Sequence, residues 1–74
     1  MLDPQAELEL VNQQIVSLIA RIAERHDQIE KLQQEGRSTE SAGSLLHFME
    51  AVLLHREHYR EALLEQLDVD SIRW

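Results

Sequence analysis

The chain has 74 residues, of which seven are Lys or Arg and fourteen are Asp or Glu, so that its formal net charge is −7. It contains no cysteine and no run of about 18 apolar residues, which excludes a disulfide framework, a cysteine-based zinc module, a thiol enzyme and a transmembrane span. The acidic first residues have no apolar signal-peptide core, so we expect a cytoplasmic protein. The acidic balance argues against partners such as nucleic acid or anionic membranes.

A first helix is predicted over residues 4–35. Asp3 followed by Pro4 is typical of a helix start, because aspartate caps free backbone N–H groups and proline suits the first helical position. Apolar residues then recur three and four positions apart, with one break at Arg25, and this is the heptad pattern of a helix that packs along one seam. The seam residues are Leu8, Val11, Ile15, Leu18, Ile22, Ile29 and Leu32.

Gly36 predicts the end of this helix, because glycine adopts a positive φ without steric strain. A turn over residues 36–39 follows, and Ser38 or Thr39 is expected to cap a second helix over residues 40–67. The apolar face of the second helix is broader than a coiled-coil seam and resembles that of a bundle helix. It comprises Ala42, Leu45, Leu46, Met49, Val52, Leu53, Tyr59, Leu63, Leu64 and Leu67.

Two helices of similar length joined by a short turn predict an all-α fold, a single antiparallel hairpin domain. The second helix carries more apolar surface than one neighbour can cover, and Phe48, Leu54 and Val16 lie off the main stripes as well. We therefore expect two copies to form a four-helix bundle, with a helix of another protein as the alternative partner. The tail over residues 68–74 either packs on the bundle end through Trp74 or binds a partner.

The predicted function is protein–protein interaction, as a small scaffold or regulatory module with no catalytic activity and no cofactor. The binding energy is expected from apolar interface residues of both helices: Leu8, Val11, Ile15, Leu18, Ile22, Leu45, Met49, Val52, Leu53 and Leu63. We expect His26, Arg56 and Arg60 to set register or specificity rather than affinity.

Three charged or titratable residues coincide with the apolar stripes. His26 is predicted to lie within the stripe of the first helix, about opposite Met49. There it is either a pH switch at an interface or a partly buried histidine with one hydrogen bond. Arg56 and Arg60 fall near the centre of the second stripe. Their stems pack while their heads reach water, or carboxylates of another subunit pair with them, or they form a pocket for an anion.

The remaining histidines raise the question of a metal site. His55 and His58 are three residues apart, a spacing that lets two imidazoles reach one ion, and His47 lies eight residues before His55. A zinc site needs three or four converging ligands and only two are arranged here. We therefore expect a solvated polar face and predict no metal ion.

Three resemblances accompany these patterns. Residues 36–49 and 53–67, with a leucine pair, spaced histidines and another leucine pair, resemble a group of short uncharacterised bacterial helical proteins; this implies a bacterial source and assigns no activity. The hairpin architecture resembles the ROP family, whose members dimerise and bind RNA, although the basic surface of that family is not matched here. This leaves a ROP-like regulator, or a nucleic-acid mimic, as an alternative function.

The third resemblance concerns the first helix. Residues 11–22 are similar to the first helix of the all-helical chorismate mutases, which implies arginines and a lysine around a dianion. The aligned arginine position falls at or beside Arg21, and Lys31 is the only lysine, but no third helix of useful length follows. A small-anion-binding or chorismate-mutase-like enzyme is thus a second alternative.

Overall fold

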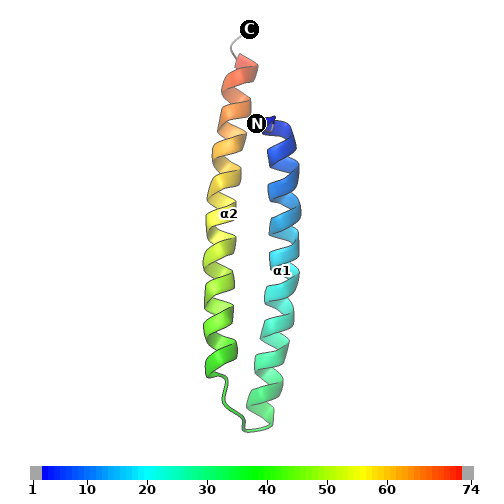
Figure 1. Cartoon of the computed structure of the whole chain (residues 1–74), viewed down its shortest axis with the longest axis vertical. Coiled ribbons are helices and arrows are strands. Elements are labelled where there is room, and N and C mark those ends of the chain that lie inside the picture. Colours follow the sequence, from blue (N-terminus) through cyan, green and yellow to red (C-terminus); the bar gives the residue numbers. More distant parts are fainter. Residues whose placement is uncertain (1–2, 73–74) are drawn as a thin grey trace.

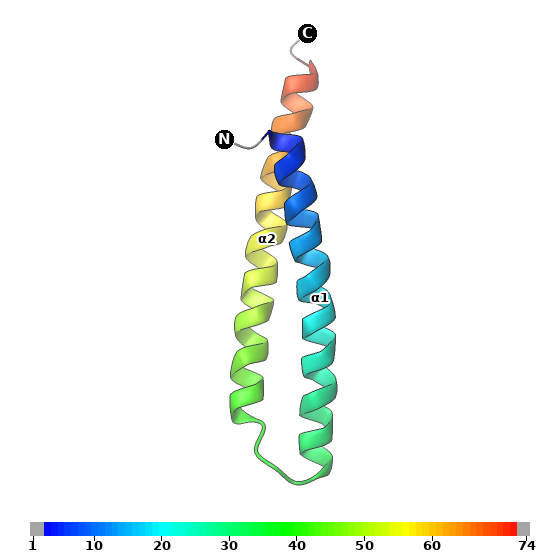
Figure 2. The ribbon, with the colours of Figure 1, turned by 45° about the vertical axis from the view of Figure 1, so that its right-hand side comes forward.

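The computed structural model describes residues 3–72, and their side chains through Asp68. Two α-helices, α1 (Pro4–Gln34) and α2 (Glu40–Ile72), run antiparallel and lie side by side in both views of the ribbon (Figures 1 and 2). The hairpin measures 61 by 19 by 15 Å. The described residues form no strand, which confirms the all-helical hairpin that the sequence predicts. None of the described helical segments is long and apolar enough to cross a membrane.

The start of α1 uses the backbone of Asp3 rather than its side chain. Asp3 has the extended geometry of a capping residue, with φ −61° and ψ 140°, and Pro4 follows it as expected. The carbonyl of Asp3 accepts the N–H of Glu7 at 2.9 Å, but its carboxylate makes no capping hydrogen bond. The predicted position of the cap is therefore right, while the side-chain hydrogen bond that usually stabilises such a cap is absent.

Gly36 ends α1, as predicted, with a positive φ of 70°. The N–H of Gly36 donates to the carbonyl of Gln33 at 3.1 Å, and the N–H of Arg37 donates to the carbonyl of Leu32 at 2.8 Å. These two bonds form the Schellman motif, which satisfies carbonyls that the helix end would otherwise leave free. The glycine is required here because a side chain disfavours this backbone conformation.

Both residues expected to cap α2 contribute to its start. The carbonyl of Thr39 accepts the N–H of Gly43 at 2.7 Å, and the hydroxyl of Ser38 accepts the N–H of Glu40 at 3.4 Å. The other end of α2 differs from the prediction, because the helix continues five residues past Leu67 to Ile72. No glycine or proline interrupts this segment, and its last turns extend beyond the start of α1 (Figure 1). Trp74 lies outside the described residues.

The core is a single narrow seam between the helices. Among the described side chains, five apolar ones are buried: Val11, Ile15, Leu46, Met49 and Leu63. Val11 and Ile15 pack with Leu63, and Leu8 and Leu53 pack against that cluster. A compact chain of this mass would expose roughly 4,700 Å², whereas the hairpin exposes 5,969 Å². The hairpin alone therefore buries little apolar surface.

Much apolar surface stays on the outside. Eight large apolar or aromatic side chains of the described residues are exposed: Leu10, Val16, Ile19, Leu45, Phe48, Leu54, Tyr59 and Leu64. Phe48, Leu54 and Val16, which were predicted to lie off the main stripes, are all exposed, but so are Leu45, Tyr59 and Leu64 of the predicted second stripe. Five of the eight belong to α2, so the unburied apolar surface is concentrated on that helix.

Candidate interaction face

Two heptad seams run side by side along α2. The inner seam faces α1, its members are spaced four and three residues apart, and all are buried or half-buried: Ala42, Leu46, Met49, Leu53, Arg56, Arg60, Leu63 and Leu67. A second set has the same spacing, and each of its members comes one residue before a member of the inner seam. It comprises Leu45, Phe48, Val52, His55, Tyr59 and Ala62. We call this set the outer seam. Five of its six members are exposed, and it contains no Asp, Glu, Lys or Arg.

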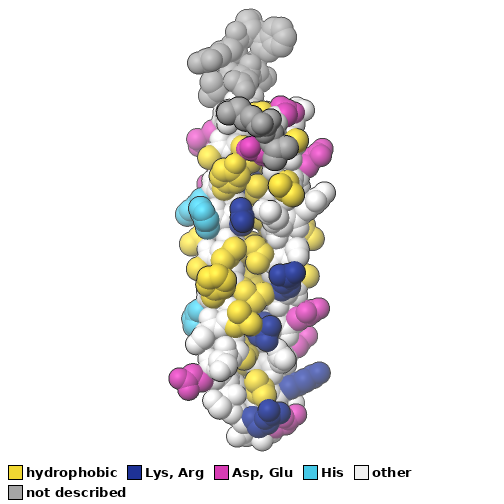
Figure 3. Space-filling view, viewed as in Figure 1, with side chains coloured by type: hydrophobic (Ala, Val, Ile, Leu, Met, Phe, Trp, Pro, Cys, Tyr) yellow, Lys and Arg dark blue, Asp and Glu magenta, His cyan; other side chains and the backbone are white. Residues whose placement is uncertain are grey.

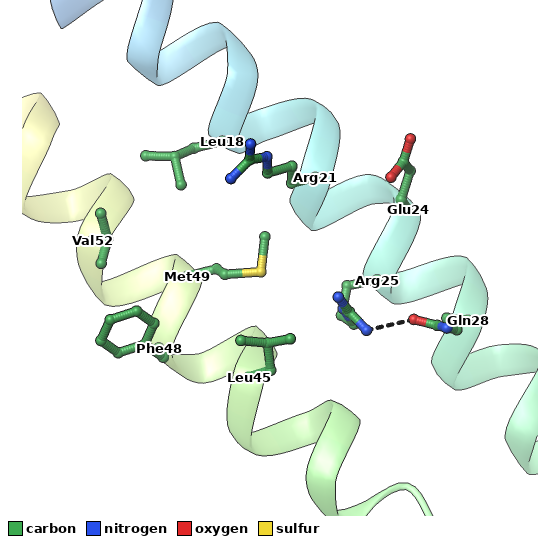
Figure 4. A pocket seen from close by; sticks show the side chains of 9 residues that line it. All are labelled: Leu18, Arg21, Glu24, Arg25, Gln28, Leu45, Phe48, Met49 and Val52. Carbon is green, nitrogen blue, oxygen red and sulfur yellow. Dashed lines mark hydrogen bonds between the residues drawn. The ribbon is translucent and has the colours of Figure 1, made fainter.

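The outer seam borders a hollow between the helices. The hollow encloses about 590 Å³, and α2 lines it with Leu45, Phe48, Met49 and Val52. On the α1 side it is lined by Leu18, Arg21, Glu24, Arg25 and Gln28. Figure 4 shows these two rows facing each other, with Arg25 donating to the amide oxygen of Gln28 at 2.6 Å. The hollow is thus apolar on the α2 side and mainly polar on the α1 side.

A second hollow continues the first toward the chain ends. The two share Leu18, Arg21 and Val52, and we call them together the groove. In the second hollow, Arg21 of α1 and Arg56 of α2 lie on opposite sides, together with Gln14. The amide oxygen of Gln14 is buried and has no hydrogen-bond partner among the described residues. A donor supplied from outside the chain would satisfy it.

The charge distribution follows the same division. On the face that carries the groove, apolar side chains gather mainly over α2 (Figure 3). Basic side chains lie along the middle of that face and over α1 (Figure 3). Within the described residues, the ion pair between Arg37 and Glu35 at 3.4 Å is the one that forms, and neither Arg56 nor Arg60 has a carboxylate within pairing distance. Both of these arginines are half-buried.

One hydrogen bond between side chains of the two helices was not anticipated. The hydroxyl of Tyr59 donates to a carboxylate oxygen of Glu7 at 2.9 Å. This bond, together with partial desolvation and the negative charge of Glu7, raises the pKa of Tyr59 above its usual value, while the charge of Arg56 opposes the rise. The sequence pattern placed Tyr59 in the apolar face of the second helix and predicted no polar partner for it. The long phenol reaches past the seam, a contact that residue spacing does not reveal.

The predicted interface residues divide into two groups. Val11, Ile15 and Leu63 are buried in the hairpin, and Leu8, Ile22 and Leu53 are half-buried. The remaining four, Leu18, Leu45, Met49 and Val52, line the groove. Sequence reasoning did not assign Phe48 or Tyr59 to the interface. The regular spacing of the outer seam was the signal that could have identified them.

The predicted position of His26 is wrong. His26 is exposed, whereas its neighbour Arg25 is half-buried and lines the groove beside Met49. Between Ile22 and Ile29, Arg25 is the one residue of α1 that is half-buried, and all the others are exposed. The break that the sequence pattern shows at Arg25 is therefore a charged residue within the stripe.

The other histidines lie on the surface of α2. His47, His55 and His58 are all exposed, and His55 belongs to the outer seam. Within the described part of the chain, no group of three His, Asp or Glu residues could hold a metal ion. The spacing of His55 and His58 thus brings no third ligand near them.

Comparison with known proteins adds no relative to these observations. No family model, no curated protein and no solved structure matches the chain. The three resemblances noted above therefore remain predictions. The features from which a function can be inferred are the outer seam and the groove beside it.

Proposed function

We propose that this chain is a protein–protein interaction module, which self-associates into a four-helix bundle and acts as a small scaffold or regulatory element rather than as an enzyme. The observation that carries this proposal is the outer seam of α2. A row of six residues in heptad spacing, free of Asp, Glu, Lys and Arg, borders the hairpin core and is mostly exposed. Such a row is typical of a helix that packs against two neighbours, and the hairpin supplies only one.

The shape of the groove favours a protein partner over a small molecule. Sites for small molecules usually bury roughly 70–90% or more of the surface of the ligand. Of the nine residues that line the larger hollow, Met49 is buried and the others are half-buried or exposed. A small ligand there would keep much of its surface in water, whereas a helix can lie along the whole row.

The broad side of the hairpin is large enough for a stable complex. Over both helices it is 61 Å long and 19 Å wide, a projected area of roughly 1,200 Å² (61 × 19), and each partner of a typical complex buries about 800 Å². Two-fold pairing is the commonest way for a single chain to cover such a face, because each copy offers the same surface to the other.

Light scattering after size exclusion, over a wide range of concentrations, tests the proposal. The unmodified chain is expected at twice its mass of 8.6 kDa, and Phe48→Glu is expected to shift it to the monomer, because the change places a charge on the outer seam. Leu54→Glu is the matched control, since Leu54 is 56% exposed and lies about 120° around α2 from Phe48. A monomer at every concentration contradicts the self-association.

A regulatory role that involves nucleic acid, as in the ROP family, is a separate proposal, and it is tested by measuring nucleic-acid binding. The net charge of −7 opposes contact with phosphates. Binding to RNA or DNA that weakens steeply with added salt would support the role. Absence of binding at low salt would dispose of it.

The second hollow gives one observation in favour of anion binding. Arg21 and Arg56 enter it from different helices, and the guanidinium group suits carboxylates and phosphates. Titration with a small dicarboxylate, followed by calorimetry, tests this candidate. Binding that is lost in both Arg21→Ala and Arg56→Ala would support it, and no detectable binding to the unmodified chain would remove it.

A further inference from the structure

We propose that the outer seam is covered by the same seam of a second copy, with the two α2 helices antiparallel about a two-fold axis that crosses them between Val52 and His55. This inference rests on the self-association proposed above and specifies its geometry. It assigns a role to four residues that sequence reasoning left out of the interface: Phe48, His55, Tyr59 and Ala62.

The unequal sides of the groove determine the direction of the axis. In the first hollow the α2 side is apolar, whereas the α1 side carries Arg21, Glu24 and Arg25; in the second hollow α2 contributes Val52 and Arg56. A two-fold axis perpendicular to the helices places α2 against α2 of the partner and α1 against α1. An axis parallel to the helices would place the outer seam against the charged α1 side and bury those charges without partners, which is costly. The perpendicular axis is therefore favoured.

The spacing of the outer seam then determines the register. In an antiparallel pair, facing positions have residue numbers with a constant sum, and a sum of 107 lets every member of the seam face another member. Leu45 faces the partner's Ala62, and Phe48 faces the partner's Tyr59 as an aromatic pair. Val52 faces the partner's His55 beside the axis. A shift by one heptad in either direction leaves two members of each seam unpaired.

The same axis gives a partner to the orphaned amide of Gln14. Leu18 and Val52 line both hollows, so an axis between Val52 and His55 passes α1 close to Leu18. Gln14 and Arg21 lie four and three residues to either side of Leu18, so the two-fold brings the partner's Arg21 to about the height of Gln14 along α1. Its guanidinium can donate to the amide oxygen of Gln14, which is buried without a hydrogen bond in the single hairpin.

A pair of charge variants tests the register. Phe48→Glu and Tyr59→Lys should each weaken the homodimer, because both place a charge on the outer seam. Mixed in equal amounts, they should form a heterodimer. One layer of Phe48 with Tyr59 is then native, and the other pairs the introduced glutamate with the introduced lysine. A mixture of Phe48→Glu with Leu54→Lys is the control. The register is refuted if this control mixture forms as much heterodimer as the mixture of Phe48→Glu with Tyr59→Lys.

Distances between spin labels test the direction of the axis. The chain has no cysteine, so Arg37→Cys and Ala51→Cys each carry one label, and both positions are exposed. At about 1.5 Å per residue, the labels at position 37 should lie roughly 50 Å apart, at opposite ends of the bundle, and those at position 51 less than about 25 Å apart.

Each outcome of the labelling experiment bears on a different claim. A dimer with the two labels at position 37 close together would place the turns at one end, which overturns the antiparallel α2 pairing and leaves the self-association intact. A monomeric mass with no measurable distance at either position overturns the pairing and the proposed self-association together. A long distance at position 37 with a short one at position 51 supports both.

Discussion

The two helices of the hairpin use their apolar residues differently. In α1 most of the apolar stripe packs against α2, with Val11 and Ile15 buried, and the exposed apolar side chains are scattered. In α2 the inner seam packs against α1 in the same way, but the outer seam repeats the heptad spacing beside it. One stripe suffices for a helix in a two-helix hairpin, so a second complete stripe indicates a helix with a further neighbour.

The charged residues reinforce this contrast. The α1 side of the groove carries Arg21, Glu24 and Arg25, whereas none of the six residues of the outer seam of α2 is Asp, Glu, Lys or Arg. Apolar content alone would not separate a partner surface from ordinary exposed leucines, because much of any protein surface is apolar. The regular spacing together with the absence of charge makes the distinction.

The largest effect is expected where α1 contributes to the core. Ile15→Ala should lower the free energy of unfolding by about 2–4 kcal/mol, because the buried side chain leaves a cavity beside Leu63. Ile19→Ala, at a position 53% exposed on the same helix, should cost less than about 1 kcal/mol. Denaturation by urea measures both at one protein concentration. Equal losses would contradict the assignment of the α1 stripe.

A matched pair of exposed residues tests the contrast between the helices directly. Phe48 on α2 and Val16 on α1 are both 67% exposed in the hairpin. Phe48→Ala should raise the dissociation constant of the dimer by about tenfold or more, equivalent to about 1.4 kcal/mol, since it removes a central aromatic contact. Val16→Ala should leave it unchanged. Sedimentation equilibrium gives both constants, and a similar change in the two would erase the distinction.

The two glycines should respond with opposite signs. Gly36→Ala should lower stability by about 1–2 kcal/mol, because φ is +70° at the end of α1 and alanine is strained there. Gly43→Ala should raise stability by up to about 1 kcal/mol, since an added Cβ meets open space and alanine favours the helix. Thermal unfolding measures both. A loss at Gly43 would show that this part of α2 is packed more closely than in the single hairpin.

The smallest effect concerns the bond between Tyr59 and Glu7. The raised pKa of Tyr59 means that its contribution to stability is complete below the usual value near 10 and disappears as the pH rises through the raised value. The unmodified chain should therefore lose stability in this alkaline range more steeply than Tyr59→Phe. Urea denaturation over a range from about one pH unit below to about one pH unit above the reference value near 10 compares the slopes. Parallel slopes would mean that the hydrogen bond does not persist in solution.

Local signals account for most of what the sequence predicted correctly. Pro4 and Gly36 act on their own backbone, so the start and end of α1 are predicted to within one residue. The end of α2 was missed because the segment after Leu67 contains charged residues that suggest a tail but no residue that stops a helix.

The errors within the candidate site have a different origin. The choice between Arg25 and His26 depends on a small rotation of α1, which a pattern with an average period of 3.6 residues does not define. The contact of Tyr59 with Glu7 depends on how far one side chain reaches. The groove depends on how the two helices face each other. Each is a property of the packed pair rather than of either helix alone.

Thiol reactivity at two alanines tests the central claim most directly, namely that the outer seam of α2 is covered in solution. Ala62 on the outer seam and Ala20 on α1 are both exposed in the hairpin, and the chain has no other cysteine to interfere. A thiol at Ala62→Cys should react many times more slowly than one at Ala20→Cys, and dilution should abolish the difference as the dimer dissociates. Equal rates at high protein concentration would contradict the account.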